Sequence, residues 1–512
     1  VSINDKATEN IQATDLSFVA GKTTGSINVT NAINVQGTAA QVADMYNEAK
    51  LSATTATIQL EDAVHTVNNL RDINTRTGGE ITIHLNKRSL ALSGSADDLA
   101  KAFDGITNYA GKLTITGPAH TLDQLITIND ATSNEITLSV PGEPLTGSAA
   151  QLAKALKGTI TGGYKGNVNI NNLKGDSLNA GDLKTILDST AGAVVIDNEI
   201  KISGTPTQVA DLCQTARFTA TSADVLLSND PHTVAELKTI NNESNGVITI
   251  HAARRGTALK DNSANLAAAL DGIVNYTGAI EIIDTHKLDE LLKINNATSG
   301  EITLAQPATA LTGSAADITN ALAGTISGGG YKGNVNINNS SGSIAATLLK
   351  QIADRTDGNV VVDNAINIIG TPEQVSDAFT ATGVTASKVT VTLSDTKHTL
   401  DQLVNINNET VGAINIDPNQ RKVNLEGSAA KMKAAFDGMS SNYYGGALTI
   451  DDADNDPVNA TDLSIIAGKT SGPVNVSNAI RLDGSPKELE SLFKETGFTA
   501  SKSIANMTGG EV

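Results

Sequence analysis

The chain has 512 residues, of which 3% are aromatic and none is tryptophan, and its formal net charge is −19. This excess of negative charge argues against nucleic acid and anionic membrane surfaces as partners. No stretch approaches the roughly 18 consecutive apolar residues that a membrane-spanning helix needs, so we expect no membrane insertion and a core of Val, Ile, Leu and Ala.

A skeleton of leucine, isoleucine, glycine and alternating apolar residues recurs along the whole chain. Three positions after its leucine stands Val19 in the first copy and isoleucine in the other eight, which predicts a short amphipathic helix. Successive leucines lie roughly 54 to 60 residues apart, which is the regular spacing of a repeat array, and they define nine units. These reference leucines are Leu16, Leu70, Leu125, Leu183, Leu237, Leu291, Leu349, Leu403 and Leu463.

A turn and a strand follow each of these helices. The seventh position after the leucine is Thr or Ser, and the ninth is glycine in eight units, Gly300 among them, and Asn134 in the remaining one. Because glycine and asparagine tolerate positive φ, we interpret the ninth position as the cap or turn at the helix C-terminus. The eleventh and thirteenth positions are apolar throughout, and this period of two predicts a strand with one buried face.

A second helix and a second strand complete each unit. Gly-Ser, Gly-Thr or Asn-Ser marks the start of nine further apolar-periodic runs, which predicts a helix N-cap at each of them. The predicted caps are Thr38, Ser95, Ser148, Thr205, Ser263, Ser314, Thr371, Ser428 and Ser485. Strands such as those at 112–116, 167–171 and 447–451 follow, so each unit is expected to run helix, strand, helix, strand.

The units are of three kinds, which differ in the length of the segment from the reference leucine to the second N-cap. This segment is shortest in A units (16–38 in the first), longest in B units (70–95) and intermediate in C units (125–148), and the order along the chain is A-B-C-A-B-C-A-B-A. A higher repeat of roughly 167 residues results, as in other arrays that contain repeats within repeats. Residues 163–172 recur verbatim at 330–339, which indicates recent duplication. The chain also begins in the middle of the pattern, so we expect it to be a piece of a larger protein.

Two series of side chains could carry chemistry. The histidine series stands five residues before the reference leucine, and it consists of His65, His120, His232, His286 and His398. Stacked, it could bind metal, but the A units have no such histidine, and a turn or cap role is the alternative. The tyrosine series stands four residues before a strand, and it consists of Tyr109, Tyr164, Tyr276, Tyr331 and Tyr444. These rings either bind sugar on the surface or cover the layer edge where helix meets strand.

Two further motifs resemble sites for charged ligands. The sequence AGKT at 20–23 and 467–470 lacks the first glycine of a phosphate-binding loop and the strand before it, so we expect no nucleotide there. Asp452, Asp454 and Asp456 have the alternate spacing of a calcium loop. Pro457 replaces the glycine that an EF-hand needs, which favours an acidic surface turn and leaves calcium as an alternative.

The remaining polar candidates are a threonine ladder and a single cysteine. Thr82, Thr137, Thr249 and Thr303 separate the apolar residues of their strands, as in ice-binding ladders, but valines at 195 and 361 interrupt the series. Cys213 is the only cysteine, which excludes an internal disulfide. It stands where other units have Tyr46 and Phe379, so we interpret its position as part of the core.

The combination of Leu-x-x-Ile on a short helix with Ile-x-Ile on a short strand, repeated about every 27 residues, resembles the leucine-rich-repeat type of α/β solenoid. The asparagine signature of that family is absent. In composition the chain is similar to the repeat regions of very large secreted bacterial surface proteins, such as adhesins, surface-layer proteins and RTX-type proteins. The calcium nonapeptide of the RTX repeats is also absent.

The expected fold is one continuous α/β solenoid over residues 1–512, with parallel strands and nine units. Each unit is either two coils or one wider coil. We expect no enzyme and no catalytic, cofactor-binding or metal-binding residues, because nearly every polar feature recurs at a fixed position instead of forming one unlike cluster. The predicted function is a structural or adhesive scaffold at the cell surface, monomeric and able to contact protein or glycan. A glycan- or calcium-binding module and an intracellular interaction solenoid are the alternatives.

Overall fold

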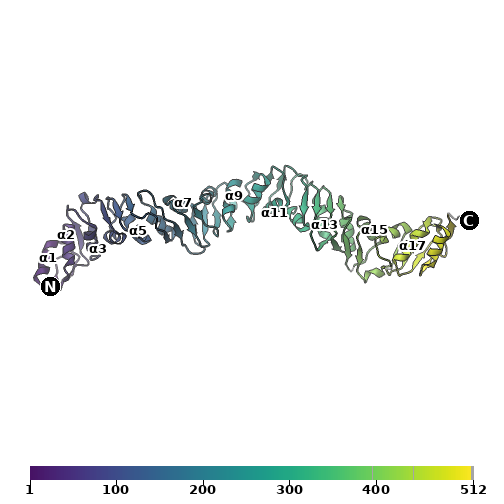
Figure 1. The fold of residues 1–512 in the computed structure, drawn as a ribbon, viewed down its shortest axis with the longest axis horizontal. Coiled ribbons are helices and arrows are strands. Elements are labelled where there is room, and N and C mark those ends of the chain that lie inside the picture. Colours follow the sequence, from purple (N-terminus) through teal and green to yellow (C-terminus); the bar gives the residue numbers. More distant parts are fainter. Residues whose placement is uncertain (395, 442, 509–512) are drawn as a thin grey trace. The chain divides into compact units, whose positions relative to one another are not determined.

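The computed structural model describes every residue except 395, 442 and 509–512. The described residues form two compact units, Val1–Arg254 and Arg255–Val512. Both are α/β, and within each of them short helices and short strands succeed one another in chain order (Figure 1). The 18 α-helices in the described part of the chain confirm the predicted alternation of helix and strand.

The first compact unit contains nine of these helices and five parallel sheets. Its helices are α1 (Ala13–Lys22), α2 (Ala39–Asn47), α3 (Val67–Asn74), α4 (Ala96–Phe103), α5 (Leu122–Ala131), α6 (Ala149–Leu156), α7 (Ala180–Ser189), α8 (Pro206–Cys213) and α9 (Val234–Glu243). Its strands are β1 (Ser2–Ile3), β2 (Asn10–Gln12), β3 (Ile27–Val29), β4 (Asn34–Gly37), β5 (Leu51–Ser52), β6 (Thr57–Leu60), β7 (Ile81–Thr82), β8 (Leu92–Gly94), β9 (Leu113–Ile115), β10 (Ile136–Leu138), β11 (Leu145–Gly147), β12 (Val168–Ile170), β13 (Ser177–Asn179), β14 (Val194–Ile196), β15 (Lys201–Gly204), β16 (Phe218–Thr219), β17 (Asp224–Leu227) and β18 (Ile248–Thr249). The sheet orders are β1-β3-β5, β2-β4-β6-β7, β8-β9-β10, β11-β12-β14-β16 and β13-β15-β17-β18.

The second compact unit repeats this plan. Its helices are α10 (Ser263–Leu270), α11 (Leu288–Ala297), α12 (Ala315–Ala321), α13 (Ala346–Ala353), α14 (Pro372–Phe379), α15 (Leu400–Glu409), α16 (Ala429–Phe436), α17 (Ala460–Lys469) and α18 (Pro486–Lys494). Its strands are β19 (Leu259–Asp261), β20 (Ile280–Ile282), β21 (Ile302–Leu304), β22 (Leu311–Gly313), β23 (Val335–Ile337), β24 (Ser343–Ala345), β25 (Val360–Val362), β26 (Asn367–Gly370), β27 (Val384–Thr385), β28 (Thr390–Leu393), β29 (Ile414–Ile416), β30 (Leu425–Gly427), β31 (Leu448–Ile450), β32 (Pro457–Asn459), β33 (Val474–Val476), β34 (Arg481–Gly484), β35 (Phe498–Thr499) and β36 (Ile504–Met507). The sheet orders are β19-β20-β21, β22-β23-β25-β27, β24-β26-β28-β29, β30-β31-β33-β35 and β32-β34-β36.

Strand pairing advances by a short, regular step. Leu259 of β19 pairs with Ile280 of β20, and Val168 of β12 pairs with Val194 of β14. Each of these steps along the chain is about half of the period that separates successive reference leucines. A strand also stands directly before most helices, for example β4 before α2, which the sequence analysis did not predict. Three short 3-10 helices, η1 (Leu85–Lys87), η2 (Ala252–Arg254) and η3 (Gln420–Lys422), lie in the three B units.

The core is built from the positions that the sequence pattern indicated. All nine reference leucines are at most 2% exposed, and the isoleucines three positions later are fully buried. Val19 is the exception, with 37% of its surface exposed. Eight of the nine predicted N-caps are confirmed, since each side chain accepts a hydrogen bond from the main-chain N–H three residues on. In the ninth case the cap is Asn262, one residue before the predicted Ser263, which is the first residue of α10.

The ninth-position glycines follow their helices as predicted, but the positive φ expected of them is wrong. None of the eight has a positive φ. Helix α11 ends at Ala297, its C-cap Thr298 is extended, and Gly300 lies in the bend two residues later. A Cβ on Gly300 would lie only 2.1 Å from the carbonyl oxygen of Gly278 in the preceding turn of chain. Thr298 Oγ1 donates to that same carbonyl over 3.1 Å and accepts from the N–H of Gly300 over 2.8 Å. Glycine is therefore required because another segment of backbone approaches closely, and not because its own backbone has a positive φ.

Candidate functional site

The histidine series and the tyrosine series, which the sequence presented as separate features, meet in space. Each of these histidines directly precedes the N-cap of a helix, and each tyrosine follows the next helix along the chain. The distances between histidine Nε2 and tyrosine Oη are 3.4 Å for His65–Tyr109, 3.2 Å for His120–Tyr164, 3.0 Å for His286–Tyr331 and 2.7 Å for His398–Tyr444. The rings of each pair lie edge to face, with centroids 5.7 to 6.0 Å apart.

Each tyrosine hydroxyl also contacts a main-chain carbonyl. Tyr109 donates to Leu90 over 2.6 Å, and Tyr444 donates to Val423 over 2.7 Å. Tyr164, Tyr276 and Tyr331 make the equivalent bond to Glu143, Thr257 and Thr309. A phenol has one hydrogen, which is directed to the carbonyl, so in the four pairs histidine Nε2 must carry a hydrogen and donate to the tyrosine oxygen. The pairs are therefore directed chains from imidazole to phenol to backbone.

Burial controls the titration of both series. The histidines are 3 to 9% exposed and the tyrosines at most 1%. Because burial disfavours the charged form, it lowers the pKa of every histidine in the series below the ordinary 6.5, and for His398 to about 4. The same cause raises the pKa of every tyrosine in the series above the ordinary 10. At neutral pH both partners are uncharged.

This geometry decides between the two interpretations of the tyrosines. An exposed sugar-binding surface is wrong, because these rings are buried and their hydroxyls are occupied within the protein. Each tyrosine instead covers the junction of helix and strand, where it forms a parallel bridge to a threonine at the end of the next helix, as in Tyr109–Thr132. Over the described residues, no group of three or more His, Cys, Asp or Glu side chains is arranged to hold a metal ion.

A third member of this arrangement escaped the sequence analysis. Four asparagines stand four residues after a reference leucine and donate Nδ2 to a carbonyl in the last turn of the next helix. These bonds are Asn74 to Lys101 (2.9 Å), Asn129 to Lys154 (2.7 Å), Asn295 to Asn320 (2.6 Å) and Asn407 to Ala434 (2.7 Å). A signal was present: histidine, asparagine and tyrosine occur together in B and C units, whereas A units have Ala20, Leu187, Ala353 and Ala467 at the asparagine position.

The three aspartates of the acidic turn accept hydrogen bonds from the main chain. Each carboxylate accepts a hydrogen bond from a separate main-chain N–H; the donors are Ala429 for Asp452 (2.7 Å), Ala479 for Asp454 (2.7 Å) and Ala453 for Asp456 (3.2 Å). Asn172 and Asn339 make the bond of Asp452 in two other units, so this position does not require a negative charge. The arrangement agrees with the acidic surface turn.

The AGKT segments lie at the wrong end of a helix for phosphate. Residues 20–22 and 467–469 form the last turns of α1 and α17, where the backbone presents carbonyl groups and the negative end of the helix dipole. A phosphate-binding loop needs the N–H groups of a helix N-terminus. Lys469 instead donates to the carbonyls of Asp437 and Met439.

The threonine ladder is one residue wide. In β9 and β10 the flanking residues face the core and only the central threonine points outward, so Thr114 lies beside Thr137. Thr137 Oγ1 contacts Thr161 Oγ1 over 3.2 Å. In the neighbouring sheet Val195 lies between Asn169 and Thr219, which interrupts the polar series.

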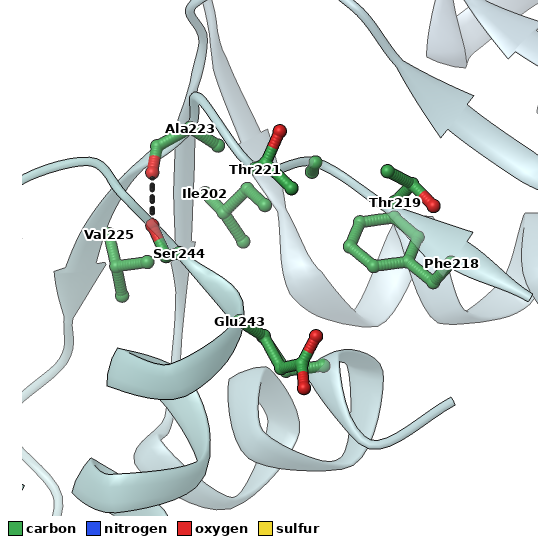
Figure 2. A pocket seen from close by; sticks show the side chains of 10 residues that line it. Ile202, Phe218, Thr219, Thr221, Ala223, Val225, Glu243 and Ser244 are labelled. Atoms are coloured by element: carbon green, nitrogen blue, oxygen red, sulfur yellow. Dashed lines mark hydrogen bonds between the residues drawn. The ribbon is translucent and has the colours of Figure 1, made fainter. Parts of the chain in front are cut away.

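A cavity of about 70 Å³ lies beside the single cysteine, between the ends of α8 and α9 and strands β15, β16 and β17 (Figure 2). Phe218, Glu243 and Ile202 are among its lining residues. Cys213 itself is half-buried, and burial raises the pKa of its thiol to about 11, so it is not a reactive thiolate at neutral pH.

The cavity exists because the second A unit has a cysteine where other A units have an aromatic ring. The residues equivalent to Cys213 in the first and third A units are Tyr46 and Phe379, and both rings are only 2% exposed. The Tyr46 hydroxyl donates to the carbonyl of Ala53 over 3.0 Å. The position is thus a core position, as predicted, but the short cysteine leaves unfilled the space that a ring fills in those two units.

No protein-family model matches the chain, and no curated protein matches it. Within residues 1–394, 396–441 and 443–508, no helix is both long enough and apolar enough to cross a membrane.

Proposed function

We propose that the chain is a structural or interaction segment of a large exported bacterial surface protein, built as one continuous α/β solenoid of nine units with two coils each. The proposal rests on one observation, which is that the repeated polar side chains form hydrogen bonds within the protein. Histidine, tyrosine, asparagine and threonine at recurrent positions bond from one turn of the chain to the next, as in His398–Tyr444, Asn407–Ala434 and Thr298–Gly278. Such contacts support length and regularity, not a single reactive cluster.

The solenoid part of the proposal rests on strand pairing. Parallel partners such as Leu259 and Ile280 favour one coil per helix, since one coil per unit would place the partners about twice as far apart along the chain. If each of the 18 helices of the described residues belongs to one coil, a spacing of about 4.8 Å per strand corresponds to a rod or arc of roughly 85 Å. Small-angle scattering of the monomer tests this, and a profile typical of a compact globule would contradict it.

The surface role rests on composition and repetition. The chain is acidic, contains near-identical blocks, and is similar in style to repeat regions of secreted bacterial surface proteins. Protease accessibility on intact cells, together with the sequence of the complete gene, tests the location. A long parent with an export signal is expected, and it would contact protein or glycan outside the cell. A full-length product close to 512 residues without an export signal would instead favour an intracellular interaction solenoid.

We further propose that the chain is not an enzyme. The buried histidines donate to tyrosine and the thiol is neutral, so neither supplies a base or nucleophile to solvent. A hydrolase and lyase screen on acidic polysaccharides tests this. Turnover that a single point substitution abolishes would overturn the proposal.

A ligand-binding module for glycan or calcium is the second candidate. A surface hollow of about 440 Å³ is lined by Asp401, Glu426, Asp451 and Lys431, among others, and its volume is within the range of roughly 300–1,000 Å³ that small-molecule sites occupy. Titration calorimetry with calcium and a glycan array test this candidate. Calcium-linked stabilisation that disappears in Asp454→Ala would favour a calcium site at the acidic turn.

A further inference from the structure

The contact between His398 and Tyr444 joins two successive coils of the second compact unit. His398 is 3% exposed and precedes the N-cap Thr399 of α15, whereas Tyr444 lies beyond α16. The imidazole Nε2 donates to the phenol over 2.7 Å, and the phenol donates to the carbonyl of Val423 over 2.7 Å. Every hydrogen in this chain of contacts already has an acceptor.

The other imidazole nitrogen is in a different situation. Nδ1 of His398 is buried, and no described residue forms a hydrogen bond with it; the same is true of Nδ1 of His286, which is paired with Tyr331. While Nδ1 is unprotonated, it is a hydrogen-bond acceptor that has no donor. Once protonated, it becomes part of a buried cation with an N–H that faces no acceptor, which is far more costly.

The surrounding charges differ between the two histidines. For His286, the carboxylates of Asp284 and Glu290 favour the cation, although Glu290 already accepts from Ser263 Oγ over 2.7 Å and from the N–H of Lys287 over 2.9 Å. For His398, burial is the cause of the lowered pKa, and among the described residues no carboxylate offsets it. His398 is therefore the more acid-sensitive of the two.

We propose that the His398–Tyr444 and His286–Tyr331 pairs are acid-sensitive latches, in which proton uptake by the histidine opens the contact to tyrosine and loosens the coils that it joins. The proposal does not depend on the proposed function. Its direction follows from linkage: the folded-state pKa of His398 is about 4, below the unfolded 6.5. The stabilisation is present above pH 6.5 and is lost as the pH falls from 6.5 toward 4. Between pH 7 and pH 4.5 these two values correspond to a local opening constant raised about 60-fold.

Hydrogen exchange of the whole chain at pH 7 and pH 4.5, corrected for intrinsic rates, tests the proposal. In the unmodified protein, peptides that cover α15 and Tyr444 should show the roughly 60-fold rise in opening. His398→Gln should remove most of this rise, because the glutamine amide can still donate to the phenol but cannot be protonated. The exposed His251 provides the matched control, and His251→Gln should leave the rise unchanged.

A rise that persists in His398→Gln would overturn the proposal. If that variant does not fold at pH 7, histidine NMR titration of the unmodified protein decides the question. The resonance assigned to His398 should titrate well below pH 6. Titration of His398 at or above 6.5 would also overturn the proposal.

Discussion

Filling the cavity beside Cys213 should stabilise the first compact unit. Cys213→Phe places at this position the ring that Phe379 supplies in the third A unit. A cavity of about 70 Å³, at roughly 24 cal/mol per Å³, corresponds to about 1.7 kcal/mol when the ring fills it completely. Cys213→Tyr should gain a further hydrogen bond, because the carbonyl of Ala220 corresponds to that of Ala53, which accepts from Tyr46.

The neighbouring carboxylate does not oppose the substitution. Glu243 lines the cavity, and the residue at the corresponding sequence position after Phe379 is Glu409, whose pKa is raised by burial. A ring and a glutamate at these two positions therefore already occur together once in the chain.

Thermal unfolding by calorimetry measures the effect. For a compact unit of about 250 residues, 1.7 kcal/mol corresponds to a rise in melting temperature of about 3 °C. The matched control is the reverse change, Phe379→Cys, which should lower the stability of the second compact unit by a comparable or larger amount. A melting temperature that falls in Cys213→Phe, or stays constant in Phe379→Cys, would refute the interpretation of the cavity as a missing ring.

Four further outcomes are expected. Gly300→Ala should destabilise the protein by about 3 kcal/mol, at the upper end of overpacking costs, because its Cβ would lie 2.1 Å from a carbonyl oxygen. The control Thr303→Ala, at an exposed position, should cost less than about 0.5 kcal/mol. Equal losses of stability in denaturant unfolding would contradict this prediction. Asn407→Ala should lower the free energy of unfolding by about 1–3 kcal/mol, since it leaves the carbonyl of Ala434 and the N–H of Gly438 without their side-chain partner. Hydrogen exchange at the end of α16 should become faster. Asp454→Ala should reduce thermal stability by about 1 kcal/mol through loss of its bond to Ala479, equally with and without calcium. Burial raises the pKa of Tyr46 to about 12. The contribution of the Tyr46 phenol to stability is therefore complete below pH 10 and is lost as the pH rises from 10 toward 12. Absorbance titration should show that Tyr46 ionises at a higher pH in the folded protein than in a peptide that contains it.

Local structure could be predicted from the sequence because its causes lie within a few residues. A Ser or Thr three residues before a main-chain N–H caps a helix whatever surrounds it, and eight of the nine predicted caps are present, whereas the ninth lies one residue earlier, at Asn262. The spacing of Leu403 and Ile406 likewise identifies the buried face of α15. The alternation of buried and exposed residues in β29 could be recognised for the same reason.

Contacts between successive turns of the chain could not be predicted in this way. Histidine and tyrosine are 44 to 46 residues apart, so nothing in local spacing brings His398 to Tyr444. The sequence also suggested the wrong reason for Gly300, because a glycine required by positive φ and one required by a neighbouring backbone look identical in a sequence. Only the tertiary structure distinguishes them, since the distance from a missing Cβ to another turn of chain depends on how the turns stack.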